Sequence, residues 1–243
     1  MEQQEKSLPR LNTFKIPPKR HLFYIVHSYY FKNLKKVMDE HIKEGFRVFD
    51  IGCGNKPFEQ YIRTLIKRDE PEYYVGCDIA QSSEQKVDII CDAANISVKE
   101  SVYDVVICTE VVEHVFEHRK VFEEAHRLLK HGGIFIVSAP FVWDLHEVPY
   151  DFYRLTRYGF QRLLSETGFE IVGELPCGGK WATVGQVMLL AIQGKKDAKK
   201  SWFVARIMLA IIRYFCNCLF SSLDNLFKDY SQFTINNIFV GKK

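Results

Sequence analysis

The sequence has no C-x-x-C pair, although its 243 residues include seven cysteines. An odd number of cysteines at irregular spacing predicts reduced, mostly buried thiols and argues against a disulfide framework or a zinc site. There is also no G-K-[S/T] run, which excludes a P-loop for nucleotide phosphates. The formal net charge is only +3, so no global positive field marks the chain as a nucleic-acid-binding protein.

The N-terminus lacks the apolar core of a signal peptide, and there is no internal repeat or low-complexity tract. These absences favour a cytoplasmic protein. A hydrophobic fraction of 47% over this length is enough for one globular domain plus an elaboration. Basic residues gather at the N-terminus and in "KKDAKK" at 195–200. Such stretches are either solvated segments or contacts for phosphates and anionic lipids.

Short apolar runs alternate with helical stretches through most of the chain. The alternation predicts right-handed crossovers and a doubly wound α/β sheet, because runs this rich in Val and Ile are typical of parallel strands buried on both faces. The expected strands are 46–52, 72–79, 87–92, 103–111, 134–140, 169–176 and 233–243, and the expected helices are about 21–43, 58–68, 119–133 and 156–168.

The pattern divides the chain into three parts. Residues 1–44 form an N-terminal arm and helix, 45–180 with 229–243 form the sheet domain, and 181–228 form a helical insertion before the last strand. Within the insertion, 202–220 is apolar over the length of a membrane span but carries Arg206 and Arg213 on nearly the same helical face. Burying two arginines in a bilayer is costly. We therefore expect an amphipathic helix that packs on the protein or lies on a membrane surface.

Acidic residues follow the predicted strands where a ligand would bind. Strands one to three end in Asp50, Asp78 and Asp92, and strand four ends in Thr109-Glu110. In a doubly wound sheet the ligand lies beyond the carboxyl ends of the strands. The acids therefore converge on one edge of the sheet.

The loop "VFDIGCGNKPF" at 48–58 resembles a dinucleotide-binding turn but lacks its third glycine. In the frame G-x-G-x-x-G, Pro57 occupies the third glycine position. The carboxylate of Asp50 would repel a pyrophosphate and attract an ammonium group. The loop therefore favours a ligand with a cationic amine, a ribose and a base, and makes a dehydrogenase the weaker alternative.

The ordered stretches "VFDIGCG", "YVGCDI", "IICDAANI", "YDVVICTEVVEHV" and "LLKHGGIFIVSAP" resemble the motifs of class I S-adenosylmethionine-dependent methyltransferases. The resemblance covers 45–175 and 232–243. It implies a Rossmann-like sheet of seven strands, mostly parallel with an antiparallel last strand, and a methyltransferase that converts S-adenosyl-L-methionine to S-adenosyl-L-homocysteine. That family often has a third glycine where this chain has Lys56, which we treat as a small departure.

By this resemblance the strand ends bind the cofactor. Asp50 and the loop of Gly52, Cys53 and Gly54 would lie by its amino-acid part, and Asp78 would bind both ribose hydroxyls. Adenine would contact Ile79, Asp92 and Ala93. Thr109 and Glu110 would border the methionine and sulfonium.

The stretch "HEVPYDFYR" at 146–154 follows strand five, where class I enzymes place substrate-facing residues. His146 is a candidate base, which Asp151 or Glu147 would orient, and Tyr153 and Arg154 belong to the same candidate site. His114 is the second candidate base. The alternative is a polar loop in which Asp151 and Arg154 pair locally.

The same stretch resembles a subgroup of small bacterial methyltransferases associated with polysaccharide and other glycan biosynthesis. The resemblance implies O-methylation of a hydroxyl on a sugar, glycan or related small molecule. The alternatives are a quinone- or RNA-directed O-methyltransferase, or a non-catalytic cofactor-binding protein that associates with a membrane. We expect no nucleic-acid partner. Residues 195–228 are a candidate peripheral membrane contact, and the sequence does not predict an oligomeric state.

The run "EVVEHV" at 110–115 raises a metal hypothesis. Glu110, Glu113 and His114 resemble an acid-x-x-acid-His cluster that binds magnesium in some O-methyltransferases, and His146 could complete such a site. Many metal-free relatives also carry Glu-His at this place. We therefore expect no metal and keep the cluster as an alternative.

Overall fold

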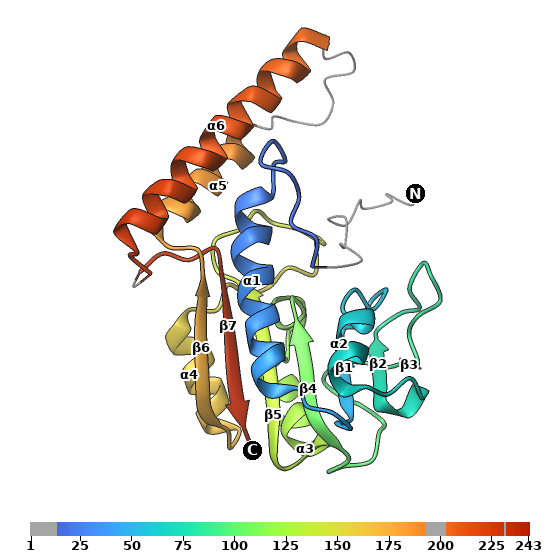
Figure 1. Cartoon of the computed structure of the whole chain (residues 1–243). Helices are drawn as coiled ribbons and strands as arrows, with labels where there is room; N and C mark the ends of the chain where they lie inside the picture. Colours follow the sequence, from blue (N-terminus) through green and yellow to red (C-terminus); the bar gives the residue numbers. More distant parts are fainter. Residues whose placement is uncertain (1–13, 193–202, 231) are drawn as a thin grey trace.

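A computed structural model describes residues 14–192, 203–230 and 232–243. Within them, seven strands form one sheet in the order β3-β2-β1-β4-β5-β7-β6 (Figure 1). Neighbouring strands are parallel except that β7 is antiparallel to both β5 and β6. The predicted doubly wound, Rossmann-like sheet with an antiparallel last strand is confirmed. The expected irregular arm lies largely outside the described residues.

The strands and helices follow the predicted order. The strands are β1 Val48–Ile51, β2 Tyr74–Asp78, β3 Ile89–Ile90, β4 Tyr103–Thr109, β5 Leu129–Pro140, β6 Glu170–Cys177 and β7 Asn236–Lys242. The helices are α1 Tyr24–His41, α2 Glu59–Ile66, α3 His118–Leu128, α4 Arg157–Glu166, α5 Lys180–Ile192 and α6 Phe203–Phe227, with short 3₁₀ turns η1 Pro71–Tyr73 and η2 Val112–His114.

Helices cover both faces of the sheet, which explains the continuous apolar runs. Val105 and Ile107 of β4 pack in the core under α1 and α2, whereas Val106 and Cys108 pack in the core under α3 and α4 (Figure 1). Successive side chains of a strand point to opposite faces. Each strand therefore contributes to two hydrophobic cores.

Two predicted elements are shorter than expected. The helix predicted to reach residue 133 ends at Leu128, and Leu129 already pairs with Tyr103 in β5. The apolar pattern continues across this boundary because Leu128 and Leu129 are both buried, one in the helix and one in the strand. The third strand contains only Ile89–Ile90, and Asp92 forms an isolated bridge with Asn95.

The predicted insertion contains α5 and α6, which pack on each other and on the start of α1. Their shared core includes Leu22, Ile25, Leu189 and Phe220. Buried Asp224 of α6 accepts hydrogen bonds from the backbone N–H groups of Gly179 and Ala182, at 3.0 Å each, and so holds the start of α5. The basic stretch 195–200 lies outside the described residues.

All seven cysteines are free, and Cys53, Cys77, Cys108 and Cys177 are buried. This agrees with the expectation of reduced, mostly buried thiols.

Candidate functional site

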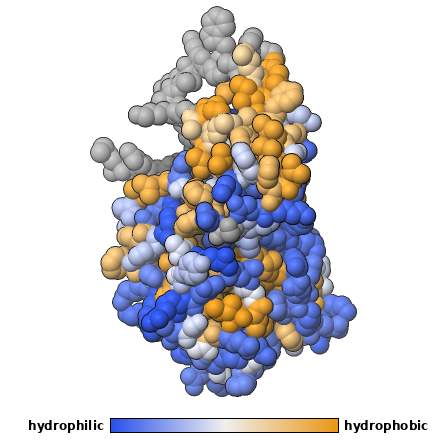
Figure 2. Space-filling model, turned by 90° about the vertical axis from the view of Figure 1, so that its left-hand side faces the viewer, coloured by the Kyte–Doolittle hydropathy of each residue, from blue (hydrophilic) through white to orange (hydrophobic). Residues whose placement is uncertain are grey.

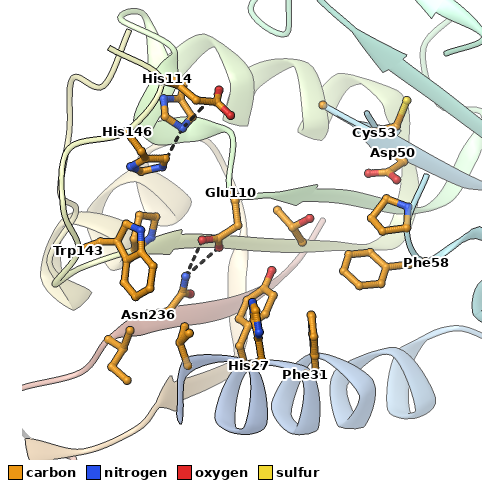
Figure 3. A pocket seen from close by; sticks show the side chains of 18 residues that line it. His27, Phe31, Asp50, Cys53, Phe58, Glu110, His114, Trp143, His146 and Asn236 are labelled. Atoms are coloured by element: carbon orange, nitrogen blue, oxygen red, sulfur yellow. Dashed lines mark hydrogen bonds and ion pairs between the residues drawn. The ribbon is translucent and has the colours of Figure 1, made fainter. Parts of the chain in front are cut away.

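A cavity opens at the carboxyl ends of β1, β4 and β5, and α1 and the start of β7 form its far wall (Figure 3). Its position agrees with the expected ligand edge of a doubly wound sheet. The lining residues are Val26, His27, Tyr30, Phe31, Asp50, Gly52, Cys53, Pro57, Phe58, Thr109, Glu110, His114, Pro140, Trp143, His146, Glu147, Ile235 and Asn236.

The loop after β1 has a left-handed backbone at Gly52 and at Lys56. Gly52 has a φ of +71°, and a Cβ there would lie 2.2 Å from Cγ2 of Val111. Lys56 also has a left-handed φ of +51°, which glycine tolerates best. Its buried Nζ lies 2.5 Å from Oδ2 of Asp88. This ion pair holds the loop at the position of Lys56.

Asp50 lies at one end of the cavity, with Cys53 beside it (Figure 3). The Asp50 side chain is buried, and its Oδ2 accepts a 2.5 Å hydrogen bond from the Tyr74 hydroxyl. Burial, and then the charge of Asp50, raise the pKa of the Cys53 thiol. The thiol is therefore neutral, and Asp50 supplies negative charge to this end of the cavity.

The remaining predicted cofactor residues lie outside the cavity lining, Gly54 in the loop after β1 and the others just at or after the ends of β2 and β3. Asp78 Oδ2 accepts from the Gly54 N–H at 2.9 Å, which ties the end of β2 to the glycine loop. The next residue, Ile79, is 69% exposed. Asp92 Oδ1 accepts from the Ala94 N–H at 2.8 Å, next to Ala93. A ligand that reached from Asp50 to these residues would follow the edge of the sheet.

A hydrogen-bonded chain crosses the middle of the cavity. Ser138 Oγ donates to Glu110 Oε1 at 2.7 Å, so the Tyr30 hydroxyl, 2.9 Å away, donates to Ser138. The Asn236 side-chain amide donates to both oxygens of Glu110 at 2.8 Å. Desolvation raises the pKa of Glu110, and the Ser138 and Asn236 donors oppose that rise. Glu110 is therefore committed to this chain of hydrogen bonds.

His114 and His146 form the other end of the cavity, with their Nε2 atoms 3.1 Å apart (Figure 3). Buried Glu113 lies next to them, its Oε1 3.7 Å from the Nε2 of His114 and 4.0 Å from that of His146. Burial, and then the charge of Glu110, raise the pKa of Glu113 well above its ordinary value. The metal hypothesis from the sequence named Glu110, Glu113, His114 and His146. The structure brings Glu113, His114 and His146 together. Glu110 instead accepts hydrogen bonds from Ser138 and Asn236.

Asp151 and Arg154 hold His146 in place. Arg154 donates to both carboxylate oxygens of Asp151, at 2.6 and 2.7 Å, and Asp151 Oδ2 accepts from the His146 backbone N–H at 3.0 Å. Burial raises the pKa of Asp151, but the hydrogen bonds from Arg154 outweigh it and lower the pKa to about 2. The local pair considered from the sequence is present, and it positions a candidate catalytic histidine.

The structure brings many of the predicted site residues to one cavity, places others beside it, and turns the Tyr153 hydroxyl away from it. The Tyr153 hydroxyl donates to the carbonyl oxygen of Phe116 at 3.1 Å, and its ring packs on His118. A catalytic role for Tyr153 thus has no geometric support. The predicted residues that line the cavity are Asp50, Gly52, Cys53, Thr109, Glu110, His114, His146 and Glu147.

Sequence reasoning missed the wall formed by α1, Trp143 and Asn236. A signal was available, since "HLFYIVHSYYF" at 21–31 places aromatic residues and a histidine on a predicted helix. His27 stacks on Phe31 with ring centroids 5.2 Å apart, and burial followed by the charge of His21 lowers its pKa to about 4. His27 is therefore a neutral, aromatic part of this wall near pH 7.

Comparison with known proteins identifies the domain. Residues 49–137 match the family model of a methyltransferase domain. No curated protein matches the chain. The solved structures described below are no more than 17% identical to this chain, so their similarity to it shows a shared fold.

Three solved structures illustrate that likeness. The [4+2]-cyclase SpnF is 17% identical with a TM-score of 0.56, over 88% of this chain and 81% of that one. An S-adenosylmethionine-dependent methyltransferase from Archaeoglobus fulgidus is 17% identical with a TM-score of 0.54, over 87% of this chain and 92% of that one. The 1,6-didemethyltoxoflavin-N1-methyltransferase of Burkholderia thailandensis, with bound 1,6-didemethyltoxoflavin and S-adenosylhomocysteine, is 13% identical with a TM-score of 0.55, over 87% and 77%.

Proposed function

We propose that this chain, a methyltransferase by the domain it carries at 49–137, methylates a hydroxyl group of a sugar, glycan or related small molecule. One observation carries the proposal. Asp50 and the glycine loop lie at one end of a single cavity, the His114–His146 pair lies at the other, and Glu110 lies between them (Figure 3). A methyl donor and a hydroxyl acceptor would meet in the middle.

S-adenosylmethionine would occupy the edge of the sheet that runs from the cavity to β2 and β3. The carboxylate of Asp50 fits the ammonium group of its methionine part. Asp78 offers the two acceptor oxygens that suit a ribose diol, and the exposed Ile79 side chain offers an apolar surface for adenine. The S-adenosylhomocysteine in the Burkholderia thailandensis structure supports the assignment for a protein of the same fold.

Methyl transfer is an in-line displacement in which the protein mainly supplies positioning. The oxygen–methyl bond forms as the sulfonium–methyl bond breaks, and the electron pair of that bond stays on sulfur. The hydroxyl proton must leave during this step. The cluster of Glu113, His114 and His146 lies at the acceptor end and would take that proton.

The acceptor wall combines hydroxyl-binding groups with aromatic surface. Glu147 borders His114, with Oε2 3.9 Å from Nε2, and can accept from a sugar hydroxyl. The rings of Phe31, Phe58 and Trp143 line the same cavity. This aromatic surface favours a second candidate acceptor, a small aromatic diol of the quinone-precursor type.

An acceptor screen tests the function directly. The full chain is incubated with S-adenosylmethionine and a panel of sugars, glycan intermediates and catechols, and S-adenosylhomocysteine is measured. We expect release of S-adenosylhomocysteine that depends on one acceptor class. Cofactor binding without turnover on any acceptor would instead favour a non-catalytic binding protein, and tight NAD binding without S-adenosylmethionine binding would overturn the assignment.

The α5–α6 hairpin supports a further proposal about where the acceptor is found. Within the described residues, Arg206–Phe227 of α6 is long and apolar enough to cross a membrane, and only 17% of its most apolar window is buried. Apolar side chains gather on the upper part of the molecule (Figure 2), above the sheet in Figure 1. Those exposed on the hairpin are Val184, Val187, Ile192, Ile207, Met208, Ile211, Ile212, Tyr214, Phe215, Leu219, Leu226 and Phe227.

We assign this surface to an anionic bilayer on the cytoplasmic side. Met208, Ile211, Phe215 and Leu219 are spaced three or four residues apart, so they form one stripe along α6. The sequence between α5 and α6 carries four lysines at 195–200, and Arg206 follows. Apolar area with flanking basic residues is the combination that binds anionic lipid surfaces. A lipid-linked acceptor would reach the cavity from such a surface.

Vesicle flotation of the full chain tests this assignment. We expect the wild type to float with vesicles of phosphatidylcholine and phosphatidylglycerol, and the double variant Ile211→Glu/Phe215→Glu to partition at least tenfold less, because two large side chains lose a burial of about 1.5–3 kcal/mol each. Val172→Glu, at an exposed position of β6, is the matched control. Equal partitioning of the wild type and the double variant would disprove membrane contact through α6.

A further inference from the structure

The hydrogen bonds of His114 and His146 fix the position of a proton on each ring. His114 Nδ1 lies 2.9 Å from the carbonyl oxygen of Tyr150. His146 Nδ1 lies 3.2 Å from the carbonyl oxygen of Asp144 and 3.3 Å from Oδ2 of Asp151. Carbonyl and carboxylate oxygens only accept. Both Nδ1 atoms therefore carry hydrogen, and in the neutral form of each ring Nε2 presents a lone pair.

These two lone pairs converge. The Nε2 atoms are 3.1 Å apart, and the rings meet nearly at right angles, with an interplanar angle of 83°. Two lone pairs repel at this separation unless a positive centre lies beside them. That centre is either one shared proton or a metal ion.

Glu113 distinguishes this cluster from an ordinary histidine pair. Its side chain is fully buried, and neither carboxylate oxygen has a hydrogen-bond partner in the described part of the chain. An unpaired carboxyl group is costly to bury, so such groups are paired or coordinate a metal. One carboxylate oxygen of Glu113 and one ring nitrogen each of His114 and His146 all lie within 4.8 Å of one another.

We propose that Glu113, His114 and His146 bind one divalent transition-metal ion. Two imidazoles and one carboxylate suit zinc, manganese, iron or cobalt, whereas magnesium and calcium prefer oxygen ligands throughout. Metal–ligand distances of about 2.0–2.2 Å place the ion between the two Nε2 atoms and Glu113. The side chains need small movements to reach these distances.

The surroundings of the three side chains match those of known metal ligands. Ligating histidines donate their other ring N–H to a carboxylate or a backbone carbonyl, which fixes the tautomer and the ring orientation. Tyr150, Asp144 and Asp151 supply these acceptors, and Arg154 holds Asp151. Asp151 and Arg154, which the sequence placed in the candidate acceptor site, thus help to orient the ligands.

The ion would leave positions open for a substrate. His114 and His146 line the cavity, so the free coordination sites face the acceptor end. A bound hydroxyl becomes more acidic on a metal, and two neighbouring hydroxyls would occupy two positions. On the basis of the proposed methyl transfer, the favoured acceptor is a vicinal diol or catechol.

Metal binding is measured on the metal-free full chain without cofactor or acceptor. Cobalt(II) is titrated and its visible absorption recorded, and zinc(II) affinity is measured by calorimetry. We expect one site per chain. His146→Ala and Glu113→Gln should each lower its affinity at least tenfold, whereas His131→Ala, which alters an exposed histidine outside the cluster, should leave it unchanged.

The outcomes separate this site from the proposed function. Wild-type affinity no higher than that of the two ligand variants, with circular dichroism showing all chains folded, would overturn the metal site and favour a shared proton. Binding of one metal ion per wild-type chain, with loss of that binding in both variants, would support the metal site even if no acceptor is ever methylated. Methyl transfer that persists in a metal-free, chelator-treated chain supports the proposed function without the metal.

Discussion

Replacing His146 with alanine is expected to lower methyl-transfer turnover by about 10²–10⁴-fold, the usual contribution of a group that assists loss of the hydroxyl proton, whether by accepting it or by holding the proposed metal ion. The Nε2 of His146 lies at the acceptor end of the cavity, 3.1 Å from that of His114. Asp50 and the glycine loop lie at the other end, so S-adenosylhomocysteine affinity should hardly change. Turnover and calorimetric affinity, measured on the same preparation, check both parts.

Tyr153→Phe is the matched control, because Tyr153 belongs to the same loop but its hydroxyl donates to the Phe116 carbonyl away from the cavity. We expect it to retain turnover. If His146→Ala also retains wild-type turnover while folded, the cluster takes no part in the reaction. If His146→Ala loses S-adenosylhomocysteine affinity in proportion to turnover, the cofactor lies at the histidine end of the cavity and the acceptor lies at the Asp50 end.

Replacing Gly52 with alanine should reduce the free energy of unfolding by about 2–4 kcal/mol. A φ of +71° is costly for a residue with a Cβ, by roughly 1–2 kcal/mol. The new Cβ would also lie 2.2 Å from Cγ2 of Val111, and overpacking of this kind costs about 1–3 kcal/mol. Urea denaturation measures the loss of stability, and calorimetry should show loss of cofactor affinity as the loop is displaced.

Gly45→Ala separates the two causes. Gly45 has a similar φ of +77°, but a Cβ there would meet nothing within 4 Å. Gly45→Ala should show only the backbone cost of the positive φ, about 1–2 kcal/mol. Adding Val111→Ala to Gly52→Ala should recover part of the stability, since contacting sites couple in a double-mutant cycle. Equal losses at Gly45 and Gly52 would show that the overlap is relieved by movement of Val111.

The acidic edge of the sheet was predictable from the sequence because its signals are local. Asp50, Asp78 and Asp92 each follow an apolar run directly, and parallel strands bring such residues to one edge. The end of α3 was misplaced because Leu128 and Leu129 continue the same apolar pattern across a change of backbone geometry.

The opposite wall was not predictable because its contacts join distant parts of the chain. Tyr30 bonds to Ser138, 108 positions away, and Asn236 to Glu110, 126 positions away. Within the stretch 146–154, spacing alone could not show that the Tyr153 hydroxyl turns away from the cavity. Glu113 was noticed as part of a motif, but its complete burial follows from the packing around η2 and cannot be read from an acidic residue in a sequence.

The far wall of the cavity has a consequence for how such a protein can diversify. Helix α1 precedes the segment 49–137 that matches the family model, and Ile235 and Asn236 follow it by almost a hundred residues. In the proposed arrangement, the donor end and the His114 part of the acceptor end lie within the matched segment, whereas stretches outside it form the far wall of the cavity. Changes in those outer stretches would reshape the far wall while the proposed donor end stays intact, so chimaeras that exchange only those stretches would show how far this wall selects the acceptor.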